Sequence, residues 1–165
     1  MSYIREQKIT CDEIPDRGYR IAGELKDDLH HFTLVLGIDF MAGEIFEAQA
    51  AALKTPFPIC SQAMQSIEKL VGVKVGPGLT KKVNAALIGP EGCFHLAELV
   101  LSAVNAGLQA SARQIPAWIP HDVYARTWKA WEQGYMGKCI HYAQPEASET
   151  LDRVFTEVLP GRQSE

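Results

Sequence analysis

The sequence predicts an α+β fold, in which an N-terminal antiparallel sheet is followed by packed helices. Two observations support this prediction. Segments with strand-like composition come before Thr55, whereas segments whose apolar residues recur at helical spacing come after Pro58. Strands and helices that are segregated along a chain favour an α+β architecture over an alternating α/β one.

The strongest strand signal is the segment 32–40, which is rich in β-branched and aromatic residues. A short turn that contains glycine follows it, and residues 44–52 are predicted to form a second, antiparallel strand. Residues 19–25 alternate loosely and are predicted to form another strand. We interpret the polar residues 1–18 as an N-terminal arm with room for one edge strand.

Prolines indicate where the helices begin. The two prolines of segment 55–58 fix their own φ angles and disfavour helix in the residue before them, so a helix starts only after this segment. From Cys60, apolar residues recur at helical spacing until Gly72 ends the helix. Later helices are predicted over residues 79–88, 93–113, 121–134 and 148–159.

The composition is that of one globular domain. With 165 residues, we predict a single domain over 1–165, with an α+β core at 19–113 and a C-terminal helical extension at 114–160. The formal net charge of −4 gives no reason to expect nucleic acid or an anionic membrane as a partner. The N-terminus lacks the apolar core of a signal peptide, and polar residues interrupt the apolar segment 94–112. We therefore expect a cytoplasmic protein without a membrane span.

Cys93 is the first candidate for chemistry, because it follows the breaker segment 89–92 and opens the longest predicted helix. A thiol at a helix start faces unpaired backbone N–H groups and the positive end of the helix dipole, and both favour the thiolate. If Cys93 lies inside the helix, it diverges from His95, which is two residues away. The alternative interpretation is a small buried residue after a tight turn.

Further candidate ligands lie at comparable junctions. Cys60 opens its own helix, although its apolar neighbours also fit a core position. His30 follows Asp28 in a polar turn before the best strand, where exposed side chains are the ordinary expectation. Thiolate, imidazole and carboxylate are ligands of zinc and iron. We therefore predict a metal site from Cys60, Cys93, His95, His30 and Asp28.

Pro58-Ile59-Cys60, Leu70-Val71-Gly72 and Gly92-Cys93-Phe94-His95-Leu96 resemble the signatures of the uncharacterised bacterial domain of unknown function 2889 family. Phe94 stands where that family usually has threonine. The resemblance covers about residues 16–115 and implies no activity.

A more distant likeness is to the U-type iron–sulfur scaffold (NifU-like N-terminal) proteins, which have a β-hairpin and cysteines at two helix starts. Cys60 and Cys93 match two of the three cluster cysteines of those scaffolds, and no cysteine stands near His30 where the third would be. This likeness covers about residues 30–110 and implies an iron–sulfur or related metal pocket.

Three functions remain open from the sequence. The first is binding of zinc, iron or an iron–sulfur cluster. The second is a thiol-dependent enzyme or sulfur carrier that uses Cys93, with His95 or His30 as base. The third is a non-catalytic binding or structural module. No nucleotide cofactor is predicted, because the glycines at 76–78 lack the lysine and spacing of a phosphate loop. The partner is an unknown protein or small molecule, and homo-oligomerisation remains open.

Overall fold

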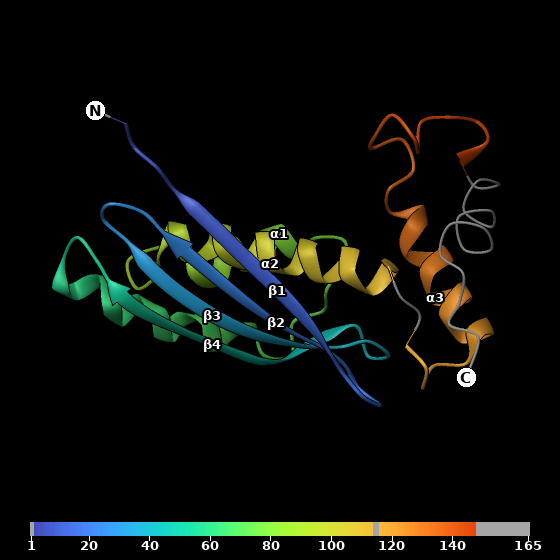
Figure 1. The fold of residues 1–165 in the computed structure, drawn as a ribbon, viewed down its shortest axis with the longest axis horizontal. Helices are drawn as coiled ribbons and strands as arrows, with labels where there is room; N and C mark the ends of the chain where they lie inside the picture. Colours follow the sequence, from blue (N-terminus) through green and yellow to red (C-terminus); the bar gives the residue numbers. More distant parts are fainter. Residues whose placement is uncertain (1, 114–115, 148–165) are drawn as a thin grey trace. The chain divides into compact units, whose positions relative to one another are not determined.

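A computed structural model of the protein describes residues 2–113 and 116–147. The chain divides into two compact units, Met1–Gln109 and Ala110–Glu165. The first unit contains a four-stranded sheet followed by helices, which confirms the predicted α+β class (Figure 1). The predicted helix over residues 148–159 lies outside the described residues.

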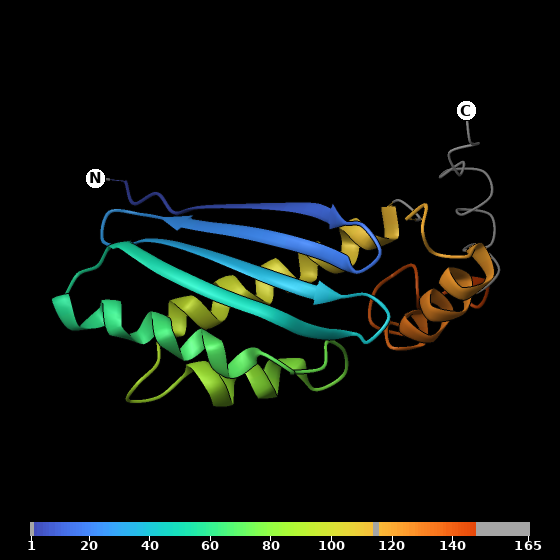
Figure 2. The same cartoon turned by 90° about the horizontal axis from the view of Figure 1, so that it is seen from below.

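The sheet is an antiparallel meander in the order β1-β2-β3-β4 (Figure 2). Its strands are β1 Glu6–Ile14, β2 Gly18–Lys26, β3 His31–Asp39 and β4 Glu44–Lys54. The segment expected as an arm with room for one edge strand thus contains β1, which pairs with β2 along its whole length. Because β1 is an edge strand with mostly exposed side chains, it lacks the apolar alternation by which strands are recognised.

Alternation along β2 and β3 builds one face of the core. In β2 the odd-numbered positions, including Ile21 and Leu25, are buried, and in β3 the even-numbered positions, including Phe32 and Leu34, are buried. At the alternate positions of β2, Arg20, Ala22 and Lys26 are exposed. Since successive side chains of a strand point to opposite faces, this pattern gives the sheet one face for packing.

Three helical segments follow the sheet: the 3₁₀ helix η1 Pro58–Leu70, α1 Leu79–Leu87 and α2 Phe94–Arg113, of which α2 runs from the first unit into the second. Pro58 is the first residue of η1, as its fixed φ and missing N–H allow. In α2, a methyl group at Gly107 would overlap Ile21 Cδ1 of β2, so this glycine permits close packing of helix on sheet. No described helix, within 2–113 and 116–147, is long and apolar enough to cross a membrane.

The second unit contains α3 His121–Gln133 among its described residues. Tyr124 of this helix is buried and its hydroxyl donates a hydrogen bond to the backbone carbonyl of Ser111. Burial raises the pKa of Tyr124 to about 12. This phenol is therefore a neutral hydrogen-bond donor that holds two segments of the unit together.

Candidate functional site

The turn between β2 and β3 is organised around the carboxylate of Asp27. The Asp27 side chain is fully buried. Its Oδ1 accepts hydrogen bonds from the backbone N–H groups of Leu29 (2.8 Å) and His30 (2.7 Å). The Asp27 N–H in turn donates to the carbonyl of His30 at 2.8 Å. Such an Asx turn satisfies the backbone of a tight hairpin with an aspartate at its first position.

The other carboxylate oxygen is held by the segment before β1. Oδ2 of Asp27 accepts from the Tyr3 hydroxyl at 2.7 Å and from Arg5 Nε at 2.8 Å, and Arg5 Nη2 lies 2.7 Å away. Arg5 Nη1 also lies 3.8 Å from Glu98 Oε2 of α2. The pairing of β1 with β2 brings Tyr3 and Arg5 to a turn that is 22–24 residues away in sequence.

Asp27 is ionised, because these partners outweigh its burial. Burial by itself raises the pKa of the carboxyl group. The hydrogen bonds from Tyr3, from the backbone N–H groups of Leu29 and His30, and from Arg5 lower the pKa more strongly, so the net pKa is well below the usual range. The site therefore contains a fixed negative charge that only accepts hydrogen bonds.

His30 is oriented by this charge. Its Nδ1 lies 3.1 Å from Asp27 Oδ1, and because an ionised carboxylate only accepts, Nδ1 carries the hydrogen. In the neutral imidazole the lone pair is then on Nε2. The His30 ring is largely buried and packs edge-on against Phe32, with the ring centroids 5.3 Å apart. Asp27 and Phe32 thus set both the tautomer and the orientation of His30.

A second imidazole lies against the first. His95, in the first turn of α2, has its ring centroid 4.3 Å from that of His30, with an angle of 44° between the planes. Burial lowers the pKa of His95, and the electrostatic influence of His30 and Arg5 lowers it further against the opposing effect of Glu98 and Asp27. His95 is therefore mainly neutral near pH 7, and its ring has a lone pair available.

The predicted metal ligands are only partly brought together. His30 and His95 are in contact, whereas Asp28 is exposed and contributes its backbone carbonyl, which accepts from Lys54 Nζ at 2.6 Å. The carboxylate beside His30 is that of Asp27. Within residues 2–113 and 116–147, no group of three or more His, Cys, Asp or Glu side chains is arranged to hold a metal ion.

The two candidate cysteines are both half-buried free thiols at helix starts. Cys93 immediately precedes α2; its N–H donates to the Leu87 carbonyl at 2.7 Å and its carbonyl accepts from Ala97. Its side chain packs against the hydrophobic core, which matches the alternative interpretation of this residue.

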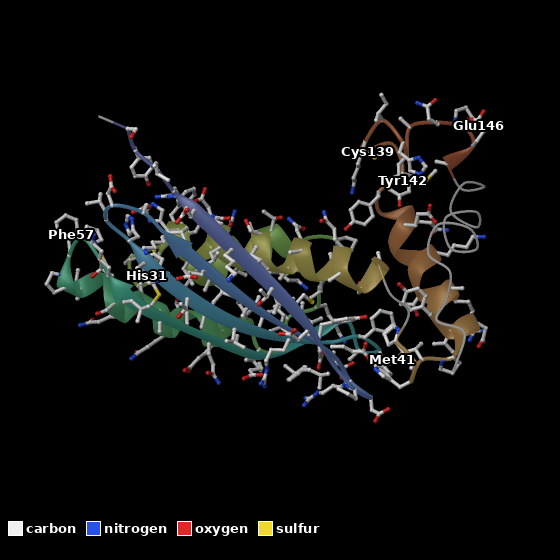
Figure 3. All side chains as sticks on the ribbon, viewed as in Figure 1. His31, Met41, Phe57, Cys139, Tyr142 and Glu146 are labelled. Carbon is white, nitrogen blue, oxygen red and sulfur yellow. The ribbon has the colours of Figure 1, made fainter. Side chains whose placement is uncertain are left out.

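Cys60 is the third residue of η1. Because β4 runs back to the end of the sheet where β3 began, η1 starts at the same end as the Asp27–His30 turn (Figures 2 and 3).

Of the other two cysteines, Cys11 is partly buried and Cys139 is exposed, so their reactivities can be compared. Burial, with a smaller contribution from the charge of Asp12, raises the pKa of Cys11 to about 11. This lowers its thiolate fraction about 100-fold at neutral pH relative to an ordinary thiol. We expect Cys11 to react with iodoacetamide about 100-fold more slowly than the exposed Cys139, as followed by mass spectrometry of the peptides. Equal rates would contradict the burial of this thiol.

Sequence reasoning missed Asp27, Tyr3 and Arg5. A signal for Asp27 was present, because Asp27 continues the buried odd-numbered alternation of Ile21 and Leu25, whereas Asp28 is out of phase with it. The sequence has no comparable signal for Tyr3 and Arg5. They lie just before β1, whose exposed side chains show no clear strand pattern.

Comparison with known proteins identifies the family of the first unit. No curated protein and no solved structure matches the chain, so the likeness to iron–sulfur scaffolds is not supported. A family model described as a protein of unknown function (DUF2889) matches residues 6–109, which include all four strands and reach into α2. This match covers more than half of the 165 residues. The chain therefore belongs to the DUF2889 family.

Proposed function

We propose that the chain binds a transition-metal ion, zinc or iron, through His30 Nε2 and the imidazole of His95. The observation that carries the proposal is the hydrogen bond from His30 Nδ1 to the buried Asp27 carboxylate, beside a second imidazole. Metal-binding histidines commonly donate their other ring N–H to a carboxylate, which fixes the tautomer and makes the ligating nitrogen more basic. Asp27, Tyr3 and Arg5 then support the ligands without touching the metal.

Two imidazoles leave coordination positions open. Tetrahedral zinc takes four ligands, and catalytic sites fill one of them with water. Cys93 is two residues before His95 and Cys60 opens η1 at the same end of the sheet, but Cys93 packs on the core, so a thiolate joins the two imidazoles only if its side chain turns toward them. An iron–sulfur cluster would need both thiolates, whereas a mononuclear ion can take two, one or none, with water in the remaining positions.

The first test is metal content and affinity. We expect protein purified without oxygen to retain zinc or iron near one ion per chain, and to bind Co²⁺ after the metal is removed. His30→Gln and His95→Gln should each weaken Co²⁺ binding at least about tenfold, because each removes one ligand. The matched control is His31→Gln: His31 is adjacent to His30, but its Nε2 pairs with Glu24 at 2.7 Å. Its Co²⁺ affinity should match that of the wild type.

Spectroscopy of the Co²⁺ protein identifies the remaining ligands. A sulfur-to-cobalt charge-transfer band that is lost in Cys93→Ser or Cys60→Ser would assign that thiolate to the metal. Visible bands of the wild type without a sulfur band would assign a site of imidazole and water ligands. Wild-type protein that contains no metal and shows no Co²⁺ bands would refute the proposal.

A second candidate is acid–base chemistry at the same histidines. It is favoured by the Asp27–His30 pair, since a buried carboxylate that orients an imidazole is the arrangement of a general base. Cys93 would be the nucleophile of a thiol-dependent enzyme or sulfur carrier. This candidate requires that the Cys93 alkylation rate falls in His30→Gln or His95→Gln protein free of metal. An unchanged rate would favour a non-catalytic module, in keeping with the packing of Cys93 on the core.

A further inference from the structure

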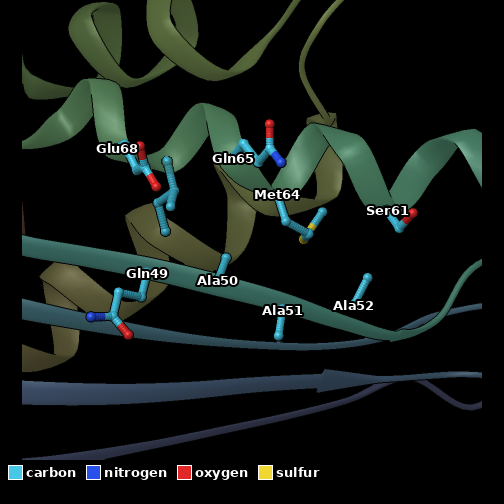
Figure 4. Close-up of a pocket in the computed structure, with 9 residues that line it drawn as sticks. Gln49, Ala50, Ala51, Ala52, Ser61, Met64, Gln65 and Glu68 are labelled. Atoms are coloured by element: carbon cyan, nitrogen blue, oxygen red, sulfur yellow. The ribbon is translucent and has the colours of Figure 1, made fainter.

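A cleft of about 570 Å³ lies between the free edge of the sheet and η1 (Figure 4). β4 is the last strand in the order β1-β2-β3-β4, so one of its edges has no neighbouring strand. Ala50 and Ala52 are directed toward η1, whereas Ala51 is directed away from it. The volume is within the range of about 300–1,000 Å³ that is usual for ligand clefts. The lining residues are Gln49, Ala50, Ala51, Ala52, Ser61, Met64, Gln65, Ile67 and Glu68.

The backbone along the cleft is available for pairing. The start of β4 is closed, because Ile45 N–H donates to the Val73 carbonyl and the Ile45 carbonyl accepts from Gly72. Beyond this point the ladder with β3 is the only backbone pairing of β4 among the described residues. Alternate residues of an edge strand direct their N–H and C=O groups outward, where an extended chain can pair with them.

The two edges of the sheet differ in how they are protected. The β1 edge carries charged side chains, which discourage pairing with another strand; these are Glu6, Lys8, Asp12 and Glu13. The β4 edge from Ala48 to Leu53 carries no charge and four alanines. Small side chains leave room for the residues of an incoming strand. The sequence thus protects one edge and leaves the other open beside a cleft.

We propose that this cleft binds an extended peptide segment of a partner protein, which adds a fifth strand beside β4 and places a lysine or arginine next to Glu68. Strand addition at a sheet edge that is flanked by a helix is an established mode of peptide recognition. Glu68 is the only ionisable residue of the lining, and it is exposed on η1 one turn from Gln65. Charge complementarity therefore selects a basic side chain. This proposal does not depend on metal binding.

The test uses a fluorescein-labelled heptapeptide of alternating threonine and valine with a central lysine. Fluorescence anisotropy with the full chain should show saturable binding, about tenfold tighter than for the same peptide with central glutamate. A peptide that is N-methylated at alternate amides should lose binding, because it cannot donate to β4. Hydrogen exchange of amides in residues 47–53 should slow when the lysine peptide is bound.

Charge reversal makes the test specific. Glu68→Lys should reverse the preference toward the glutamate peptide, whereas the matched reversal Glu6→Lys on the opposite edge should leave both affinities unchanged. Circular dichroism verifies that both variants are folded. Equal binding of the N-methylated peptide, or a preference that Glu68→Lys does not change, would overturn the proposal. Protection of residues 47–53 that rises with protein concentration alone would also overturn it, because a second copy would then occupy the edge.

Discussion

Asp27→Asn is expected to lower the free energy of unfolding by about 3 kcal/mol. The carboxylate is fully buried and accepts on both oxygens, from backbone N–H groups at Oδ1 and from Tyr3 and Arg5 at Oδ2. An asparagine must turn its NH₂ group toward one of these sets of donors. At least two donors then lose their acceptor, and the positive charge of Arg5 loses its partner.

Urea denaturation monitored by circular dichroism measures this loss, and the neighbouring residue supplies the control. Asp28 is exposed, so Asp28→Asn should change the free energy of unfolding by no more than about 0.5 kcal/mol. The two substitutions make the same chemical change one residue apart in one turn. Equal stability of both variants would contradict the role assigned to Asp27.

The effect of Asp27→Asn should also depend on pH. The pKa of Asp27 is lower in the folded chain than in the unfolded chain, where it is about 3.9. The unfolded state therefore binds the proton first, so the carboxylate stabilises the fold fully above this pH and progressively less below it. The difference in the free energy of unfolding between wild type and Asp27→Asn should be constant from about pH 6 to 8, because this range lies about two units or more above the unfolded-state pKa. The difference should shrink as the pH falls below about 4.

The parts of the fold that sequence reasoning predicted are those with strong local signals. The β-branched run of β3 acts within a few residues, and β3 lies within one residue of its predicted bounds. The start of η1 was predicted only after Pro58, but the helix is of the 3₁₀ type and begins at Pro58 itself, because proline is well tolerated at the first helical position. β1 has no such local signal, because its side chains are mostly exposed. It is a strand because its backbone pairs with β2 along its whole length. The odd-numbered alternation of β2 was readable, but it was not extended to Asp27.

The candidate site was predicted by residue type and not by geometry. His30 and His95 were singled out as imidazoles, and the structure places them in contact across 65 positions of sequence through the packing of α2 beside the β2–β3 turn. Cys93 was expected to approach them only if it preceded the helix. It does precede α2, yet its side chain packs on the core. Local spacing cannot distinguish these directions, because they depend on how the preceding loop enters the helix.

In that loop, Gly92→Ala should lower the free energy of unfolding by about 2–3 kcal/mol. A methyl group at Gly92 would overlap the carbonyl oxygen of Leu87, which accepts the Cys93 N–H at 2.7 Å. The overlap is with backbone, so no change of side-chain rotamer relieves it. The loop must shift, and it carries the start of α2 with it.

Gly89→Ala in the same loop separates this overlap from ordinary glycine strain. Gly89 has φ of +143° and no atom within 4 Å of the added methyl group, so its substitution costs conformational strain alone, about 1–2 kcal/mol. In urea denaturation, Gly92→Ala should have a lower free energy of unfolding than Gly89→Ala. Equal stability of the two variants would contradict the overlap at Gly92. Because His95 is three residues after Gly92, Gly92→Ala should also weaken Co²⁺ binding more than Gly89→Ala does. A stability loss with unchanged Co²⁺ affinity would instead separate the α2 start from the proposed metal site.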